Sequence, residues 1–227
     1  MKFLELQTVL NPLLWEPRGQ LKPEVRGALL RISEDFEQTI NIDFPILDRV
    51  ITGSNVNYNY TKDSDLDLHI ITDYTKIDCA EEADELFDAL RHLYEHEHDI
   101  QIHGIPVTLY VEDVNTPGVS AGIYSIDKDQ WIQRAKPIQL DTIDKKQVLE
   151  QTVMWHTIID HVMAKQDYDL ALSTQRLVRN YRKLGLKQPQ AEFSTANLVY
   201  KQLRSDKTID KLNDHVNSLH DKELSIQ

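Results

Sequence analysis

The chain has 227 residues, of which 41% are hydrophobic, and it carries 25 Lys and Arg against 37 Asp and Glu. This apolar content is enough to build a core in one domain or two small ones, so the composition excludes global disorder. The formal net charge of −12 argues against a general nucleic-acid coat protein, because such proteins bind the phosphate backbone through basic surfaces.

The sequence also indicates a cellular compartment. Its single cysteine, Cys79, can form neither an internal disulfide nor a cysteine-based zinc site, which suits a reducing environment. No stretch approaches the roughly 18 apolar residues of a membrane span, and the start, MKFLELQTVL, lacks the pattern of a signal peptide. We therefore expect a cytoplasmic protein without a membrane partner.

The first 140 residues predict a mixed α/β domain. Apolar residues at helical spacing follow Pro23 up to Ile40, and a second helical pattern runs from about 81 to 96. Residues 46–52 and 66–72 are typical of strands, and residues 99–103 and 106–111 alternate around Gly104 as a hairpin does. The prediction is a small mixed sheet with at least four strands, flanked by helices.

Beyond Pro137 the sequence predicts only helices. Two apolar stripes repeat with a period of 3.6 residues, and two further helices are expected at about 194–204 and 207–220. The first stripe contains Val148, Leu149, Val153, Trp155, Ile159 and Val162, and the second contains Leu170, Leu177, Tyr181 and Leu184. We therefore predict an α/β (α+β) fold with a core domain at 1–140 and a helical C-terminal domain at 141–227.

The most informative stretch begins at Gly53-Ser54, at the end of one predicted strand, and reaches Asp65-Leu66-Asp67 at the start of the next. Side chains alternate along a strand, so Asp65, Asp67 and His69 share one face while the residues between them point into a core. Two carboxylates at this spacing repel each other unless they are solvated or hold a hard cation such as Mg²⁺. The simpler alternative is an exposed strand end bearing solvated acids.

Histidines permit two interpretations. His69 either forms a hydrogen bond within the core or to an aspartate, or it takes part directly in catalysis. We assign it a supporting role beside the carboxylates. His92 and His96 have the spacing of metal ligands on a helix, but an exposed helix end explains them more simply, because the spacing places no third ligand.

Gly-Ser, a spacer and Asp-x-Asp together resemble the signature of the DNA polymerase β-like nucleotidyltransferase superfamily. Other segments look like the nucleotidyltransferase-like proteins of tailed bacteriophages, and the likeness covers most of the chain. Those segments are Leu10-Asn11-Pro12 with Trp15, Leu21-Lys22-Pro23, the spacer from Asn57 to Asn59, Ser64 to His69, and Glu192-Phe193-Ser194 to Asn197-Leu198-Val199 with Lys201 and Leu203-Arg204.

The resemblance implies an enzyme that moves a nucleoside monophosphate from a nucleoside triphosphate to an acceptor hydroxyl and releases pyrophosphate. Asp65 and Asp67 would be the catalytic carboxylates and would hold Mg²⁺ or Mn²⁺. The nucleotide would be bound by Gly53, Ser54, Asn59 and Ser64. The acceptor stays open between an RNA end, a protein and a small molecule, and a phage-encoded protein would act in the host cytoplasm.

One position departs from the superfamily pattern. A third carboxylate is expected on a neighbouring strand, and alignment of residues 106–111 puts Thr108 there. Because that carboxylate usually holds the catalytic metal or takes the acceptor proton, its loss favours an alternative, a nucleotide-binding or interaction module without turnover. Glu112 lies on the same predicted face but about 13 Å further along the strand, too far to substitute directly. A protein-interaction domain is a third alternative, although it leaves the motif unexplained.

A basic segment stands out from the acidic chain. Residues 165–204 carry eight basic and three acidic side chains, and Arg176, Arg179 and Lys183 fall on one side of a predicted helix with Arg182 beside them. A triphosphate needs cations, so we predict that this face turns towards Gly53 and Asp65 and binds the nucleotide. The alternative is a solvated helix face.

Overall fold

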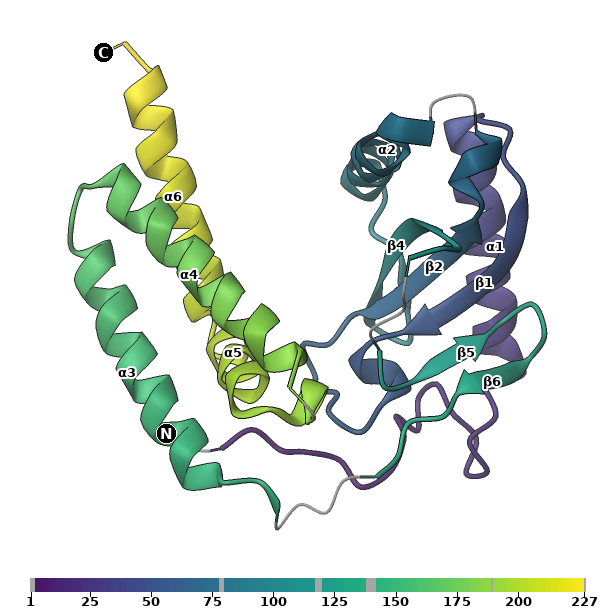
Figure 1. The fold of residues 1–227 in the computed structure, drawn as a ribbon, viewed down its shortest axis with the longest axis horizontal. Coiled ribbons are helices and arrows are strands. Elements are labelled where there is room, and N and C mark those ends of the chain that lie inside the picture. Colours follow the sequence, from purple (N-terminus) through teal and green to yellow (C-terminus); the bar gives the residue numbers. More distant parts are fainter. Residues whose placement is uncertain (1–2, 78–79, 117–119, 138–141, 189, 227) are drawn as a thin grey trace. The chain divides into compact units, whose positions relative to one another are not determined.

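A computed structural model of the chain describes residues 3–77, 80–116, 120–137, 142–188 and 190–226 (Figure 1). The chain forms two compact units, Leu6–Ile138 and a second one made of Met1–Glu5 and Gln139–Gln227. Cys79 and the predicted boundary at residue 140 lie outside the described residues. Compact units are domains only if each can fold independently. The division into domains at 1–140 and 141–227 therefore stays a prediction.

The first unit is built on a mixed sheet of six strands in the order β3-β4-β2-β1-β5-β6. Strand β2 pairs in parallel with β4, and the other neighbours are antiparallel. The strands are β1 Ile46–Thr52, β2 Leu66–Thr72, β3 Gln101–Ile102, β4 Ile105–Asp113, β5 Ile123–Ser125 and β6 Gln130–Gln133. The predicted α/β class, the mixed sheet and the hairpin around Gly104 are confirmed.

Two strands were absent from the sequence prediction. Strands β5 and β6 have three and four residues, which is too short for an alternating pattern to stand out. Their aromatic residues Tyr124 and Trp131 pair across the hairpin, and Asp129 in the turn has a φ of 52°. The aromatic residues on either side of an Asp-Lys-Asp turn were the available signal for a hairpin here.

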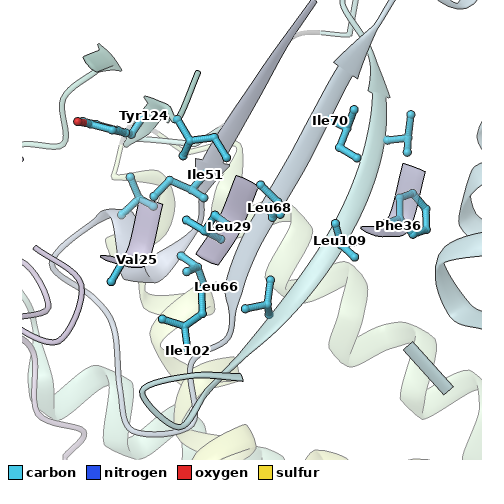
Figure 2. Close-up of a cluster of buried hydrophobic side chains, with 14 of the residues drawn as sticks. Val25, Leu29, Phe36, Ile51, Leu66, Leu68, Ile70, Ile102, Leu109 and Tyr124 are labelled. Carbon is cyan, nitrogen blue, oxygen red and sulfur yellow. The ribbon is translucent and has the colours of Figure 1, made fainter. Parts of the chain in front are cut away.

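Helices α1 (Pro23–Ile40) and α2 (Ala83–Glu97) match the two predicted helices. Val25, Leu29 and Phe36 of α1 are fully buried against the apolar residues of β2 and β4, as Figure 2 shows. Helix α2 joins the same core through Phe87 and Tyr94, and the Tyr94 ring meets Phe36 edge to face at 5.2 Å. One face of the sheet is therefore apolar and covered by helices. The first unit also contains short 3-10 helices at Ser54–Val56, Tyr74–Lys76 and Ala80–Glu82.

The second unit is helical, as predicted. Its elements are α3 Lys145–Met163, α4 Tyr168–Leu186, a 3-10 turn at Ala191–Phe193, α5 Thr195–Ser205 and α6 Thr208–Leu224. Asp144, Asp167 and Ser194 each accept a hydrogen bond from a backbone N–H of the following first turn, at α3, α4 and α5 respectively. These caps explain where the three helices begin.

Parts of the predicted apolar stripes of α3 and α4 are wrong. Val153, Leu177 and Leu184 are 55%, 57% and 64% exposed. Helix α4 instead buries small side chains, including Ala171, Thr174 and Gly185. A β-carbon on Gly185 would lie 2.7 Å from Ala196 Cβ, so close packing against α5 selects small residues on this face rather than large apolar ones.

None of the helices in the described ranges combines the length and the apolar character needed to cross a membrane.

Candidate functional site

The site begins at Gly53, directly after β1. Its backbone has φ 79° and ψ −163°, a conformation that is essentially restricted to glycine. A β-carbon at this position would lie 2.0 Å from Asp67 Oδ2, so the carboxylate occupies the space that a side chain would fill. Gly53 therefore makes room for Asp67, whereas the family resemblance implied only a role for Gly53 in binding the nucleotide.

Hydrogen bonds join the two halves of the motif. The Ser54 hydroxyl donates to Ser64 Oγ at 2.9 Å, and the Asn55 side-chain amide donates to the backbone oxygen of Asp65 at 2.7 Å. Ser64 also accepts a hydrogen bond from the backbone N–H of Thr61 at 2.9 Å. These bonds hold the Gly-Ser turn and the start of β2 in one local arrangement.

Asn55 in turn is held by the N-terminal segment. The Asn11 amide donates to Asn55 Oδ1 at 2.8 Å, and Trp15 Nε1 donates to the Asn55 backbone oxygen at 2.8 Å. All three side chains are buried. The sequence analysis assigned no role to Asn55. The signal was the Asn11 and Trp15 segment that forms part of the family resemblance.

The predicted acidic side of β2 is confirmed for Asp67 and His69, whereas Asp65 lies one residue before the strand. Along β2, Leu66, Leu68 and Ile70 are fully buried, while Asp67 and His69 are half-buried on the other side. Thr52 pairs with Asp67 on one side and Thr108 pairs with it on the other, and paired residues point to the same face of a sheet. The strand alignment that put Thr108 beside the aspartates is confirmed.

His69 is held between neighbouring strands. Its Nε2 lies 2.9 Å from Thr52 Oγ1, and its Nδ1 lies 3.0 Å from Glu112 Oε1. The contact with His69 lowers the pKa of the Glu112 carboxyl, against the opposing effect of burial. Glu112 therefore contacts the histidine that follows Asp67 on this face, although it lies four residues beyond Thr108 along β4.

Aromatic and charged side chains extend this face to the edge of the sheet. The Tyr110 ring stacks on His69 with centroids 4.8 Å apart, and the Arg91 guanidinium lies 5.0 Å from the Tyr110 centroid. Burial raises the pKa of Tyr110 to about 12, and the negative charge of Asp67 adds to the shift. Arg91 is itself paired with Asp88 and Glu95 at 2.6 and 2.9 Å.

A cavity of about 380 Å³ opens where α2 meets β4, lined by residues that include Tyr110, Glu112 and Arg91. Three further carboxylates, from Asp84, Glu85 and Asp88, line it as well. The carboxylates outnumber the one guanidinium, so this cavity is electrostatically unfavourable for a bare triphosphate.

The remaining predicted site residues lie in varied surroundings. Asn59 and Ser64 are buried, with 1% and 5% of their surface exposed, so little of either side chain is open to a ligand. Arg176, Arg179 and Lys183 are exposed on α4 in the second unit. Arg182 instead packs on α5, where it donates to Asn197 Oδ1 at 3.2 Å and lies over the Tyr200 ring.

The donor set at the motif suits a hard divalent cation. Asp65 and Asp67 provide two carboxylates at one end of β2, and the absent side chain of Gly53 leaves the Asp67 carboxylate its space. Across the described ranges, no group of three or more His, Cys, Asp or Glu side chains is arranged to hold a metal. Thr108, beside Asp67, contributes no carboxylate. His92 is exposed, and its Nδ1 lies 2.7 Å from the Asp88 backbone oxygen.

Comparison with known proteins adds little to this geometry. No family model matches the chain, and no curated protein matches it. Among solved structures, the chain is similar to the STING-associated CdnE c-di-GMP synthase from Capnocytophaga granulosa, with 14% identity and a TM-score of 0.23 over 90% of this chain and 83% of that one.

Proposed function

We propose that the chain is a metal-dependent nucleotidyltransferase, which moves a nucleoside monophosphate from a nucleoside triphosphate to an acceptor hydroxyl and releases pyrophosphate. The observation that carries this proposal is the joining of the Gly-Ser turn to the Asp-x-Asp strand. Gly53 makes room for the Asp67 carboxylate, and the bonds from Ser54 and Asn55 reach residues 64 and 65. Solvated acids at a strand end would not need such a partner.

Asp65 and Asp67 are the residues that would hold Mg²⁺ or Mn²⁺. A metal bound there would neutralise phosphate charge and would stabilise the negative charge on the attacking and leaving oxygens. Without it, two carboxylates would repel an incoming triphosphate, so nucleotide binding should depend on the divalent cation.

The chain's own groups would then bind and orient the nucleotide. The half-buried turn at Gly53 and Ser54 would contact phosphate oxygens, with the Ser54 hydroxyl turning from Ser64 Oγ to donate to the anion. Ser64 and Asn59 would hold that turn in place from the protein interior, since both side chains are buried. His69, held by Thr52 and Glu112, would keep the face beside Asp67 ordered.

A second candidate is a module that binds nucleotide without turnover. One observation favours it: the residue paired with Asp67 on β4 is Thr108, where the superfamily pattern expects a carboxylate. Such a module would keep metal-dependent nucleotide binding and release no pyrophosphate. The two candidates therefore differ in chemistry and share the same binding site.

Binding is tested first, by titrating the protein with each of the four ribonucleoside triphosphates in Mg²⁺, in Mn²⁺ and in a chelator. We expect binding that requires the metal and that falls at least tenfold in Asp65→Asn and Asp67→Asn. The control is Asp43→Asn, which removes a carboxylate from an exposed position in the same unit. Both site variants should melt at the wild-type temperature or above it, because each removes a charge from a like-charged pair.

Turnover is tested by measuring pyrophosphate release with RNA, protein and small-alcohol acceptors. Release that is lost in Asp67→Asn supports the transferase, and binding without release under any condition selects the second candidate. An absence of metal-dependent nucleotide binding would contradict both. A melting temperature that collapsed in either variant would instead show that the aspartates are structural.

A further inference from the structure

A second cavity lies in the first unit, and among its lining residues only Trp15 also supports the candidate site, through its bond to Asn55. Its volume is about 590 Å³, within the range of small-molecule sites. The walls come from the N-terminal segment 8–22, from Tyr58 and from Arg134 after β6. Much of the lining is apolar and is formed by Leu10, Pro12, Trp15, Pro17 and Tyr58.

Buried and hydrogen-bonded tryptophans support this cavity. Trp15 is 3% exposed, stacks on Trp131 with centroids 4.7 Å apart, and donates its Nε1 to the Asn55 backbone oxygen. Trp131 in turn donates its Nε1 to the Gly19 backbone oxygen at 2.7 Å. A cavity wall that is ordered before a ligand arrives loses little conformational entropy on binding.

Two cations face this apolar space. Arg134 is fixed by a hydrogen bond from its Nη2 to the Arg18 backbone oxygen at 3.1 Å, and its guanidinium lies 5.7 Å from the Trp131 ring centroid. Lys22 lines the same cavity at the start of α1. Within the described part of the chain, neither cation forms an ion pair with a carboxylate, although Glu16 also lines the cavity.

We propose that this cavity binds a small molecule that combines a planar aromatic body with an anionic group. The aromatic body would pack on the apolar rim of the cavity, where Val9 is 58% exposed and Leu10 and Pro12 also line the space, and the anion would meet Lys22 and Arg134. Carboxylate, sulfonate and phosphate share the chemistry that these cations recognise, and Arg134 offers a fork that can bind two oxygens at once. The observation behind this assignment is that two cations and one carboxylate, Glu16, line an otherwise largely apolar cavity in a chain of net charge −12.

Two probes of matched shape test the proposal. One is 1-anilinonaphthalene-8-sulfonate, which has the aromatic body and the anion, and the other is N-phenyl-1-naphthylamine, which lacks the sulfonate. Fluorescence titration of the full chain should show saturable binding of the sulfonate. We expect Lys22→Gln and Arg134→Gln each to weaken that binding about tenfold, the size of one hydrogen bond to a charged group, and to leave the neutral probe almost unaffected.

The controls separate this cavity from other surfaces. Lys136→Gln removes an exposed cation two residues from Arg134 that does not line the cavity, and Leu184→Gln alters an exposed apolar residue of the second unit. Both should bind the sulfonate as the wild type does. The circular dichroism melting curve of each variant reports whether it folds, and two independent cavity variants keep the test valid if one does not.

The proposal is overturned if neither cavity variant changes the affinity for the sulfonate, if Lys136→Gln has the same effect, or if Leu184→Gln removes the signal. It is independent of the proposed function. Asp67→Asn should bind the sulfonate with wild-type affinity, because Asp67 does not line this cavity. Failure of nucleotide binding would leave the result for this cavity unchanged.

Discussion

At the scale of single residues, Gly53 combines two properties that set its identity. Its φ of 79° with ψ of −163° lies in a region where a β-carbon is strained, and its missing side chain leaves space for the Asp67 carboxylate. The first property concerns the backbone of the turn, and the second concerns a strand that begins thirteen residues later. One glycine therefore shapes both halves of the motif.

Gly53→Ala should be destabilising and should impair the site. Backbone strain of this kind costs about 1–3 kcal/mol, and the new β-carbon would push the Asp67 carboxylate from its position. We expect a lower midpoint in urea unfolding and weaker metal-dependent nucleotide binding. The matched control is Gly27→Ala in α1, where the added carbon meets only Arg31 Nη1 at 3.5 Å and helix propensity improves. If Gly53→Ala unfolds like the wild type, the backbone argument is wrong.

At the scale of elements, the pairing of β2 with β4 decides what stands beside the aspartates. Parallel register places Thr108 next to Asp67, Tyr110 next to His69 and Glu112 next to Ile71. Neighbouring strands lie about 4.8 Å apart, so each pair shares one patch of the face. Thr108, which lacks the expected carboxylate, and Glu112, which contacts His69, are thus four residues apart on β4.

Thr108→Glu should strengthen divalent-metal binding, because it adds a third anionic ligand beside Asp67. Calorimetric titration with Mn²⁺ should show a several-fold tighter complex. Gln101→Glu on β3 makes the same charge change at an exposed position of the same sheet and should leave the affinity as it is. An unchanged affinity in a folded Thr108→Glu protein would mean that Asp67 does not bind the metal, or that another group already completes the site.

Glu112 predicts a pH dependence of stability. Its pKa is lowered in the folded protein by the contact with His69, so the stabilisation is present above the unfolded-state pKa and is lost as the pH falls through the lowered folded-state value. Urea unfolding at pH 7 should therefore show Glu112→Gln to be less stable than the wild type. The difference should shrink when both are unfolded near pH 3.

The control for this pH effect is Glu34→Gln, which neutralises an exposed carboxylate in the middle of α1. It should cost little stability at either pH. A difference between Glu112→Gln and the wild type that stayed constant from pH 7 to pH 3 would contradict the link to ionisation. It would point instead to packing of the Glu112 side chain.

At the scale of the whole molecule, the charge is divided between the units. The candidate site and its neighbouring cavity are rich in carboxylates, whereas the exposed side of α4 carries Arg176, Arg179 and Lys183. Burial of the small-residue face of α4 leaves these cations in solvent within their own unit. That this basic face binds an anionic nucleotide stays a prediction.

Arg179→Ala should weaken metal-dependent nucleotide binding about tenfold or more if this basic face contacts the triphosphate. Lys211→Ala, which removes an exposed cation from α6 of the same unit, should bind nucleotide normally. Loss of affinity for a polymeric acceptor alone would make the face a binding track for the acceptor. No loss of either would make it a solvated helix face.

Much of this protein could be predicted from its sequence because the deciding signals are local. Helical periodicity predicted α1 and α2, and the alternation around Leu66 and Leu68 predicted β2 and its acidic side. The alignment of two strands predicted that Thr108 lies beside Asp67. Each of these follows from residues within a few positions of one another, or from strands long enough to carry a pattern.

Other features were decided by the tertiary structure alone, since they depend on distances between segments that are far apart in the chain. The contact of Glu112 with His69, and the support of Asn55 by Asn11 and Trp15, need side chains that meet only after the strands pair. The exposed side of α4 was mispredicted at Leu177 and Leu184 because close approach of α5 favours small residues over large apolar ones. Hydrophobicity predicts which residues prefer burial, and packing determines which of them are buried.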